Sequence, residues 1–369
     1  GNYNLTFKLP PDSLTGVYRV HAVSTYNGQP AISSTVFGVN VIPVPDRYPT
    51  IQGAVNAATT KNNTILVAPG TYNEDVTINK ALKLVGVEPT TTIINGSGTG
   101  TVLTVTASNV EIRRFTIKNS GSPPKSGITL NNSSGSTISE NIITSNNGYG
   151  INIHSSNNIF ITDNTLANNN YGIYLNHSTR ITIRRNNINS NKYNFGVFGD
   201  SIPDFNHYIS TSNTVNGKPI YYWVNRQNKR VPTNAGFVGI VNCINIDVRG
   251  LTIRKNGQGV LFAFTNNSFI ERINAMGNEY GIYLVHSYSN IIVGSGMSNN
   301  TVGIYQRYCD ENIICHNNIV NNTNQVDLYQ SSNTWDDSAG RGNYWSDYTG
   351  VDDGSGNRTA DDGVGDTLL

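Results

Sequence analysis

Branched apolar residues recur at a fixed spacing along the central part of the chain. Coils of 22 residues follow one another from Tyr149 to Lys192 and again from Gln258 to Thr323. A period in the twenties is the signature of a solenoid. Counted from the first glycine of each coil, the apolar columns stand at +1 (Ile128, Ile151, Ile173, Val260, Ile282, Ile304), +11 (Ile138, Ile161, Ile183, Ile270, Ile292, Ile314) and +16 (Ile143, Leu166, Ile188, Ala275, Met297, Ile319).

Three columns per coil predict three short strands per coil. Stacked coils place each column on one parallel sheet ladder, with neighbouring strands about 4.8 Å apart. A single coil is too short and too polar to fold alone, so it needs neighbours on both sides. The predicted fold is therefore all-β, a right-handed parallel β-helix in which each column forms one ladder.

Asparagine keeps its own position in this register. It stands at +14 in several coils, where one strand must bend into the next, and it tolerates left-handed backbone and can hydrogen-bond within a turn. Stacked asparagines would form an amide ladder inside the coil. The residues are Asn141, Asn164, Asn186 and Asn317.

Residues 1–43 have a different pattern from the rest of the chain. Period-two alternation predicts strands at Asn4–Leu9, Gly16–Ser24 and Ser33–Val41, an antiparallel β-extension with one apolar face. A sheet this small is marginal in water and leaves unpaired edges. We expect residues 1–43 to pack on the shaft, or to pair with another copy or a neighbouring surface subunit.

The β-helix itself is predicted for residues 44–332. Its N-terminal end should be covered by a short helix over 48–60, with Thr50 as N-cap and Ile51, Ala54, Val55 and Ala58 on the buried face. An irregular insertion at 193–236 carries several aromatic residues, Trp223 among them, and insertions on a solenoid often form its binding face. The alternative is that these aromatic residues only cover a distorted coil.

The tail, residues 333–369, combines aromatic and acidic residues. Trp335, Tyr344 and Trp345 are suited to cover the C-terminal end of the core. The aspartates that follow are separated by glycine and asparagine, and such a loop can turn several oxygens toward one Ca²⁺, although a solvated acidic turn is the alternative. The candidate calcium ligands are Asp352, Asp353, Asp361, Asp362 and Asp366.

Charge and cysteine content exclude several classes of protein. The formal charge of +1 gives no basis for a nucleic-acid surface, and no apolar run approaches the roughly 20 residues of a membrane span. The three cysteines do not make a disulfide framework: Cys243 and Cys309 lie three coils apart, while a bond between Cys309 and Cys315 is left open. Gly1 carries no signal peptide, so the chain has the character of a mature extracellular piece.

Sequons for N-glycosylation favour an extracellular or cell-surface location. Some share one position in successive coils, which would place glycans in rows on exposed turns. Chance matches in a chain rich in Asn, Ser and Thr are the alternative. The sequons begin at Asn4, Asn62, Asn95, Asn131, Asn132, Asn176, Asn266, Asn299, Asn321 and Asn357.

Two sets of side chains are candidates for chemistry or recognition. Position +13 carries Arg114, Glu140, Asp163 and Arg185 in consecutive coils, so Glu140 and Asp163 would lie about one strand spacing apart, as paired carboxylates of a glycosidase do. A stabilising charge ladder is the competing interpretation. The second set is a row of tyrosines that could stack on sugars or on another subunit: Tyr149, Tyr171, Tyr174, Tyr280, Tyr283 and Tyr305.

Four motifs in the expected order resemble a known family. The motifs are YPTIQGAVNAA (48–58), VAPGTYNEDVTI (67–78), NTVNGKPIYYWVN (213–225) and NYWSDYTGVDDGSGN (343–357). Together with the 22-residue coils, they are similar to the NosD-like, periplasmic copper-binding β-helix proteins, whose archaeal relatives lie at the cell surface. The coils also resemble the wider group of pectin-lyase-like solenoids. The resemblance implies copper as a cofactor. The two Met and six His residues, with His177 and His286 several coils apart, do not favour a copper site.

The sequence therefore predicts an extracellular structural or adhesive surface protein, glycosylated and self-assembling, and favours a non-enzymatic role. Two alternatives stay open. One is a polysaccharide-active enzyme or carbohydrate-binding module, because similar β-helices include lyases, esterases and epimerases that act on polyuronates. The other is an accessory protein that handles copper.

Overall fold

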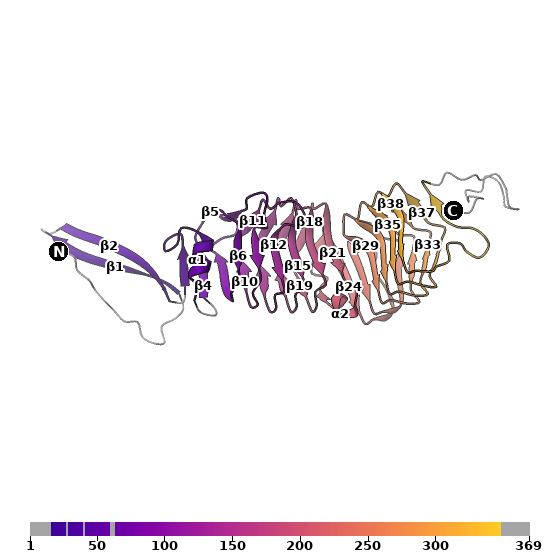
Figure 1. Cartoon of the computed structure of the whole chain (residues 1–369), viewed down its shortest axis with the longest axis horizontal. Helices are drawn as coiled ribbons and strands as arrows, with labels where there is room; N and C mark the ends of the chain where they lie inside the picture. The colour runs from indigo at the N-terminus through magenta and orange to yellow at the C-terminus, as the bar shows by residue number, and fades with distance from the viewer. Residues whose placement is uncertain (1–15, 27–28, 40, 60–62, 348–369) are drawn as a thin grey trace.

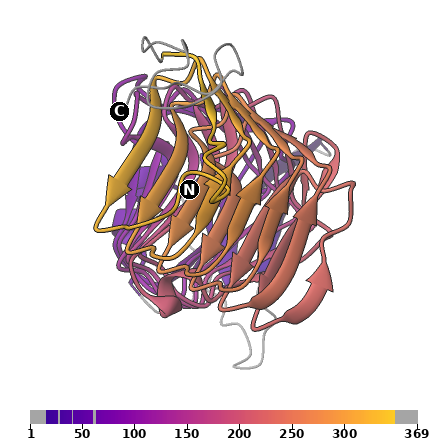
Figure 2. The same ribbon diagram turned by 90° about the vertical axis from the view of Figure 1, so that its right-hand side faces the viewer.

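The computed structural model describes residues 16–26, 29–39, 41–59 and 63–347. Short strands stack coil upon coil into an elongated shaft, with a β-hairpin projecting from its N-terminal end (Figure 1). The parallel pairing of successive coils confirms the predicted parallel β-helix. Viewed along the shaft from the C-terminal side, the later coils lie in front of the earlier ones (Figure 2).

The N-terminal stack has three faces. An 8-stranded sheet contains β3 (Val41–Val44), β4 (Asn63–Val67), β7 (Leu82–Gly86), β10 (Glu111–Arg113), β13 (Thr137–Ser139), β16 (Phe160–Thr162), β19 (Thr182–Arg184) and β22 (Tyr208–Ile209). The second face is β5 (Gly70–Asn73), β8 (Thr92–Asn95), β11 (Thr116–Lys118), β14 (Ile142–Thr144), β17 (Thr165–Ala167), β20 (Asn187–Asn189) and β23 (Thr214–Val215). The third is β6 (Val76–Ile78), β9 (Leu103–Val105), β12 (Ser126–Asn131), β15 (Tyr149–His154), β18 (Tyr171–Asn176) and β21 (Tyr193–Phe198).

The C-terminal stack also has three faces. The first is β24 (Lys218–Val224), β26 (Phe237–Val241), β29 (Gln258–Ala263), β32 (Tyr280–Val285), β35 (Val302–Arg307) and β38 (Asn324–Tyr329). The second is β25 (Gln227–Arg230), β27 (Ile244–Arg249), β30 (Phe269–Glu271), β33 (Ile291–Val293) and β36 (Ile313–Cys315). The third is β28 (Thr252–Arg254), β31 (Asn274–Met276), β34 (Gly296–Ser298), β37 (Asn318–Val320) and β39 (Tyr344–Trp345).

Each apolar column is buried, but none runs the length of the shaft. Ile173 pairs with Phe195 in β21, where its sheet ends, whereas Ile282 belongs to the sheet that starts with β24. The expectation of one ladder per column is therefore wrong: each column is divided into two ladders on different sheets. The division falls within the predicted insertion, 193–236.

A tight hairpin causes this division. β23 pairs with β24 antiparallel, and the two residues between them, Asn216 and Gly217, have positive φ angles of 48° and 78°. An Asn-Gly pair of this kind is the preferred two-residue hairpin turn. Strands before the turn run parallel to one another, strands after it also do so, and the two sets are antiparallel within one 13-stranded sheet.

Close stacking explains the glycine near the start of each coil. A Cβ atom on Gly172 would lie 2.3 Å from the carbonyl oxygen of Asn194 in the next coil, and one on Gly259 would lie 2.4 Å from that of Gly281. Real Cβ atoms do not approach so closely, so a side chain at either position would push the coils apart.

The predicted asparagine ladder is present. The Oδ1 of Asn164 accepts hydrogen bonds from the backbone N–H and the Nδ2 of Asn141, both at 3.0 Å, and Asn186 does the same for Asn164. The ladder continues to Asn213, and in the C-terminal stack Asn317 bonds to Asn343 in the same way. These amides satisfy buried backbone groups where the chain turns between strands.

Helix α1 (Ile51–Ala57) covers the N-terminal end of the core, as predicted. Thr50 is its N-cap, with Oγ1 accepting from the N–H of Gly53 at 3.1 Å. A second cap was not predicted from the sequence: the carboxylate of Glu74, in the next coil, accepts from the N–H groups of Ile51 and Gln52 at 2.7 and 2.9 Å. Negative charge at a helix N-terminus is stabilising.

The N-terminal hairpin consists of β1 (Gly16–Tyr26) and β2 (Gln29–Val39), paired antiparallel along their whole length. The predicted strand Ser33–Val41 ends earlier, because Val41 begins β3, which pairs in parallel with β4 as the first strand of the shaft. The predicted strand Asn4–Leu9 lies outside the described residues. Within the described part of the chain β1 and β2 pair only with each other, so pairing with another subunit stays a prediction.

At the C-terminal end, Trp335 and Trp345 pack against the core of the second stack, with ring centroids 5.6 Å apart. Cys243, Cys309 and Cys315 are buried free thiols. Among the described residues, no helix has the length and apolar character that crossing a membrane requires.

We predict that Asn164→Ala strongly destabilises the shaft. Asn164 is 1% exposed, and its loss removes the acceptor for Asn141 and the donor to the Ile138 carbonyl. Buried groups left unsatisfied cost about 1–3 kcal/mol each. Urea unfolding should show a lower midpoint at an unchanged slope.

Asn170→Ala is the matched control in the same coil, because the Asn170 side chain makes no hydrogen bond with the described residues. Equal midpoints for the two variants would mean that the ladder adds nothing to stability.

Candidate binding groove at the junction of the two stacks

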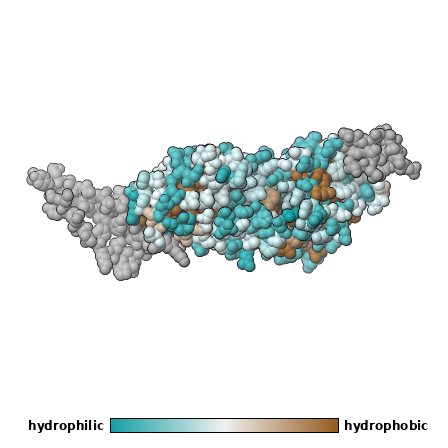
Figure 3. All heavy atoms as spheres, viewed as in Figure 1, coloured by the Kyte–Doolittle hydropathy of each residue, from teal (hydrophilic) through white to brown (hydrophobic). Residues whose placement is uncertain are grey.

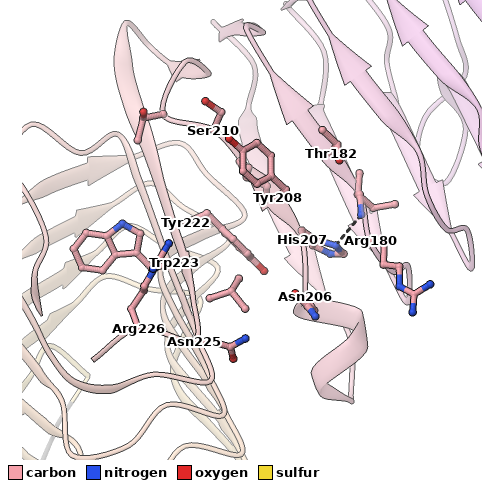
Figure 4. A pocket seen from close by; sticks show the side chains of 14 residues that line it. Arg180, Thr182, Asn206, His207, Tyr208, Ser210, Tyr222, Trp223, Asn225 and Arg226 are labelled. Carbon is pink, nitrogen blue, oxygen red and sulfur yellow. Dashed lines mark hydrogen bonds between the residues drawn. The ribbon is translucent and has the colours of Figure 1, made fainter. Parts of the chain in front are cut away.

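A groove opens where the two stacks meet. The 8-stranded sheet ends at β22, and the next strand of the chain to reach this level, β24, belongs to the other sheet. The resulting space of about 570 Å³ is lined by residues 180–182, 206–211 and 222–226 (Figure 4). Its size lies within the range of about 300–1,000 Å³ typical of small-molecule sites.

Aromatic side chains form part of the wall. Tyr208, in β22, is 56% exposed, and the Arg184 guanidinium lies over its ring at 4.6 Å from the centroid. Trp223, in β24, is half-buried and meets Tyr221 edge to face at 6.4 Å. Tyr222 is buried and donates from its hydroxyl to the carbonyl of Phe205 at 2.7 Å. The ring of Tyr208 is therefore the exposed aromatic surface of the groove, whereas Trp223 lines the groove and also packs against the core of the second stack.

His207 is the buried titratable group of the groove. It is 5% exposed, its ring stacks on that of Tyr222, and its Nδ1 accepts from the N–H of Ile181 at 3.3 Å. This bond assigns the proton of the neutral ring to Nε2, which has no hydrogen-bond partner among the described residues. Burial lowers the pKa of His207 to about 4, against an opposing effect of the backbone at Asp204 and Asn206. The ring is neutral at pH 7.

Two arginines border the groove without a counter-charge. Arg180 and Arg226 make no ion pair with any described residue, and none of the described residues that line the groove has a carboxylate. In Figure 4 the two side chains lie on opposite sides, Arg180 beside His207 and Arg226 beside Trp223. The groove thus combines aromatic surface, amide groups and positive charge.

The predicted +13 column lies elsewhere on the shaft, as a row of ion pairs. Arg185 binds Asp163 through Nε and Nη2 at 2.6 and 2.8 Å, and Arg114 lies 3.9 Å from Glu140. Hydrogen bonding to Arg185 lowers the pKa of Asp163. All four residues have positive φ angles, so they occupy one left-handed turn position in successive coils. The geometry is that of a charge ladder along exposed turns.

The predicted tyrosine row is present but largely packed against itself. Tyr149 stacks on Tyr174 at 4.7 Å, and Tyr283 stacks on Tyr305 at 4.6 Å. Tyr171 and Tyr283 are buried, because they lie where the third face of the first stack meets the second stack, and they cannot present a ring face to a ligand. Tyr149, Tyr174, Tyr280 and Tyr305 are partly exposed.

A buried carboxyl at this contact was not predicted from the sequence. Burial raises the pKa of Glu279 to about 7, although Tyr171 and Lys192 act in the opposite direction. The Oε2 atom of Glu279 and the hydroxyl of Tyr171 lack partners of good geometry among the described residues. No motif marks Glu279, since its burial comes from the meeting of two stacks that are far apart in sequence.

The sequons occupy varied environments. Asn132, Asn299 and Asn321 are exposed turn residues with positive φ, and the last two lie one coil apart as expected. Four other sequons have partly buried asparagine side chains: Asn95, Asn131, Asn176 and Asn266. Asn4, Asn62 and Asn357 lie outside the described residues, as do the candidate calcium ligands Asp352, Asp353, Asp361, Asp362 and Asp366. Glycosylation and calcium binding stay predictions.

Sequence reasoning identified part of the groove. It placed a binding face at 193–236 and named Trp223, but it missed Arg180, His207 and Tyr208. The useful signal was Asn216-Gly217 between two apolar segments, which marks a hairpin and hence a break in the stack.

The groove histidine should make stability depend on acidity. The unfolded chain, with a histidine pKa near 6.5, binds the proton more readily than folded His207, so stability is complete above pH 6.5 and falls as the pH drops toward 4. We predict that His207→Asn removes about 3 kcal/mol of this pH-dependent loss. Denaturant unfolding at several pH values measures it, with exposed His154→Asn as control; parallel pH profiles for wild type and His207→Asn would contradict it.

Glu279 should act with the opposite sign. Its folded pKa of about 7 exceeds the unfolded value of 4.5, so the folded state binds more protons and stability falls as the pH rises from 4.5 to 7. We predict that Glu279→Gln flattens this decline and is more stable than wild type at pH 8, as followed by thermal unfolding. Exposed Glu311→Gln is the control, and a wild-type advantage at pH 8 would refute the assignment.

Two family models match successive parts of the chain. The model of a right-handed beta helix region matches residues 51–215, and that of the periplasmic copper-binding protein NosD matches residues 220–350. The search of curated proteins found no match. The second name refers to copper, but no three His, Cys, Asp or Glu residues cluster to hold a metal ion in the described part of the chain, so these residues do not fit a copper site.

The similar solved structures have low sequence identity to this chain. The A-module of mannuronan C-5 epimerase AlgE6 from Azotobacter vinelandii is 17% identical, with a TM-score of 0.42 over 78% of this chain and 93% of that one. The Dettilon tailspike protein is 14% identical, with a TM-score of 0.41 over 76% and 62%. An alginate lyase from Paenibacillus sp. str. FPU-7 is 12% identical, with a TM-score of 0.35 over 77% and 96%.

The two family matches follow one another on either side of the hairpin turn, and the strands of both regions stack in parallel coils. The chain is a member of the NosD-like family of right-handed parallel β-helix proteins.

Proposed function

We propose that this protein is an exported surface β-helix that binds a saccharide in the junction groove and works as an adhesive rather than as an enzyme. The observation that carries the proposal is the groove itself: a space of about 570 Å³ lined by the exposed ring of Tyr208 and by Trp223. Sugar rings carry apolar C–H faces that pack on such rings, while their hydroxyl groups need polar partners.

Polar partners are available around both rings. Asn206, Ser210 and Asn225 line the groove and supply amide and hydroxyl groups for sugar hydroxyls (Figure 4). Tyr208 and Trp223 belong to β22 and β24, whose hydrogen bonds fix their backbones. A groove built on strands binds with little loss of conformational entropy.

Hydrolysis by the usual pair of carboxylates is poorly supported at this place. Glycosidases need an acid and a base or nucleophile beside the scissile bond, whereas the lining of the groove is without carboxylates among the described residues. Glu140 and Asp163 lie in the row of ion pairs with Arg114 and Arg185. This distribution favours binding without cleavage.

Export is supported by the sequence and by the family. The NosD family is described as periplasmic, and the chain carries sequons on exposed turns, including those at Asn299 and Asn321. The side of the shaft seen in Figure 3 is mostly hydrophilic, with small separate hydrophobic patches, as suits an elongated particle in water. A stiff shaft of stacked coils would hold the groove away from the ends of the molecule.

We predict that Trp223→Ala weakens saccharide binding about tenfold or more, because a buried aromatic contact contributes on the order of 1–3 kcal/mol. Binding would be measured by affinity electrophoresis through gels that contain soluble neutral or acidic polysaccharides. Thermal unfolding of each variant would show that the fold is kept.

Phe160→Ala is the matched control, since Phe160 is an exposed ring on β16 outside the groove. Equal retardation of wild type and Trp223→Ala, or no retardation in any gel, would contradict binding in the groove. Release of new reducing ends or unsaturated products during incubation would contradict the non-enzymatic role.

A further inference from the structure

We propose that the groove selects an acidic saccharide, a chain of hexuronic acid residues whose carboxylates bind Arg180 and Arg226. The inference rests on the proposed function and names the chemical class of the ligand. Three observations support it: the pairing of arginines across the molecule, the arrangement of charge in the groove, and an unused hydrogen-bond donor in its lining.

Arginines on this chain are commonly paired with carboxylates. Arg185 binds Asp163 at 2.6 Å, Arg249 binds Glu271 at 2.8 Å, and Arg341 binds Asp337 at 2.7 Å. Arg180 and Arg226 have no carboxylate partner among the described residues, and both line the same groove. Guanidinium groups bind planar carboxylates with two parallel hydrogen bonds, so two unpaired ones at one site are placed to bind a ligand with such groups.

The positive charge of the groove is concentrated rather than a result of overall composition. The whole chain has a formal charge of only +1. Around the groove, however, Arg180 and Arg226 stand on opposite sides (Figure 4). The guanidinium of Arg184 lies over the ring of Tyr208. A concave site lined by one sign of charge attracts ligands of the other sign more strongly than a flat surface does.

The two arginines also fit the aromatic residues in position. Arg226 lies three residues after Trp223, and Arg180 lines the groove beside His207 (Figure 4). A saccharide that spans the groove past Tyr208 would therefore meet one guanidinium near Trp223 and the other near His207 (Figure 4). Uronic acids offer what this arrangement requires, an apolar ring face together with one carboxylate on each residue.

The lining contributes a donor as well. His207 is neutral, it carries its proton on Nε2, and that N–H has no acceptor among the described residues. Buried donors in native proteins are nearly always satisfied, so an oxygen atom from a ligand or a water is expected here. With the two arginines, the site has donors in excess of acceptors, which favours a ligand rich in acceptor oxygens.

Isothermal titration with two ligands of equal chain length tests the inference. One is an oligomer of a hexuronic acid, and the other is the same oligomer after reduction of its carboxyl groups to primary alcohols. We expect the wild-type protein to bind the acidic oligomer about tenfold or more tightly than the reduced one, and this preference to shrink at high salt.

Arg180→Gln and Arg226→Gln should each weaken binding of the acidic oligomer about tenfold, and leave binding of the reduced oligomer unchanged. Arg180→Lys, which keeps the charge but not the planar fork, should retain part of the affinity. Arg254→Gln is the matched control, because Arg254 is exposed on β28 and outside the groove. Unfolding curves verify that each variant is folded.

The outcomes separate the two proposals. Equal affinity for the two oligomers, or arginine variants that bind the acidic oligomer as wild type does, would overturn selection by charge while Trp223-dependent saccharide binding stood. A protein that binds neither oligomer, but is retarded by a neutral polysaccharide in a way that depends on Trp223, would also overturn selection by charge and leave saccharide binding in place. Absence of binding to every saccharide would remove the proposed function and this inference together.

Discussion

The structure depends on the requirement that each coil satisfies the backbone hydrogen bonds of the next one. A solenoid has no helix ladder or closed barrel to pair its N–H and C=O groups, so the partner of a residue is the equivalent residue one coil away. At strands the backbone meets this demand. At the corners, the amides of Asn141, Asn164 and Asn186 meet it from inside, and glycines such as Gly172 let the coils approach closely enough.

The groove exists because this stacking is interrupted once. The hairpin at Asn216-Gly217 reverses the chain within one face, so that β24 continues the same sheet as β23 and leaves the edge of β22 uncovered. Strand edges are normally a liability that proteins cover. Here the uncovered edge lies beside aromatic and cationic side chains instead, so the groove forms without any addition to the regular coils.

Much of the fold could be predicted from the sequence because it is governed by local periodicity. The columns represented by Ile151 and Ile161, the Asn164 ladder and the Thr50 cap all follow from spacing and residue type. The division into two stacks could not be found in this way, because the 22-residue pattern is the same before and after the turn. His207 and Glu279 owe their burial to contacts between the two stacks, and periodicity contains no information about such contacts.

The reversal of strand direction at the hairpin separates the length of the molecule from the position of its groove. Inserting or deleting one whole coil inside either stack preserves the pairing of that stack and does not alter the residues at the junction. Gene duplication of a single repeat could therefore lengthen the reach of this protein on either side of its site independently. Relatives of different length could keep the same groove at different distances from the two ends of the shaft.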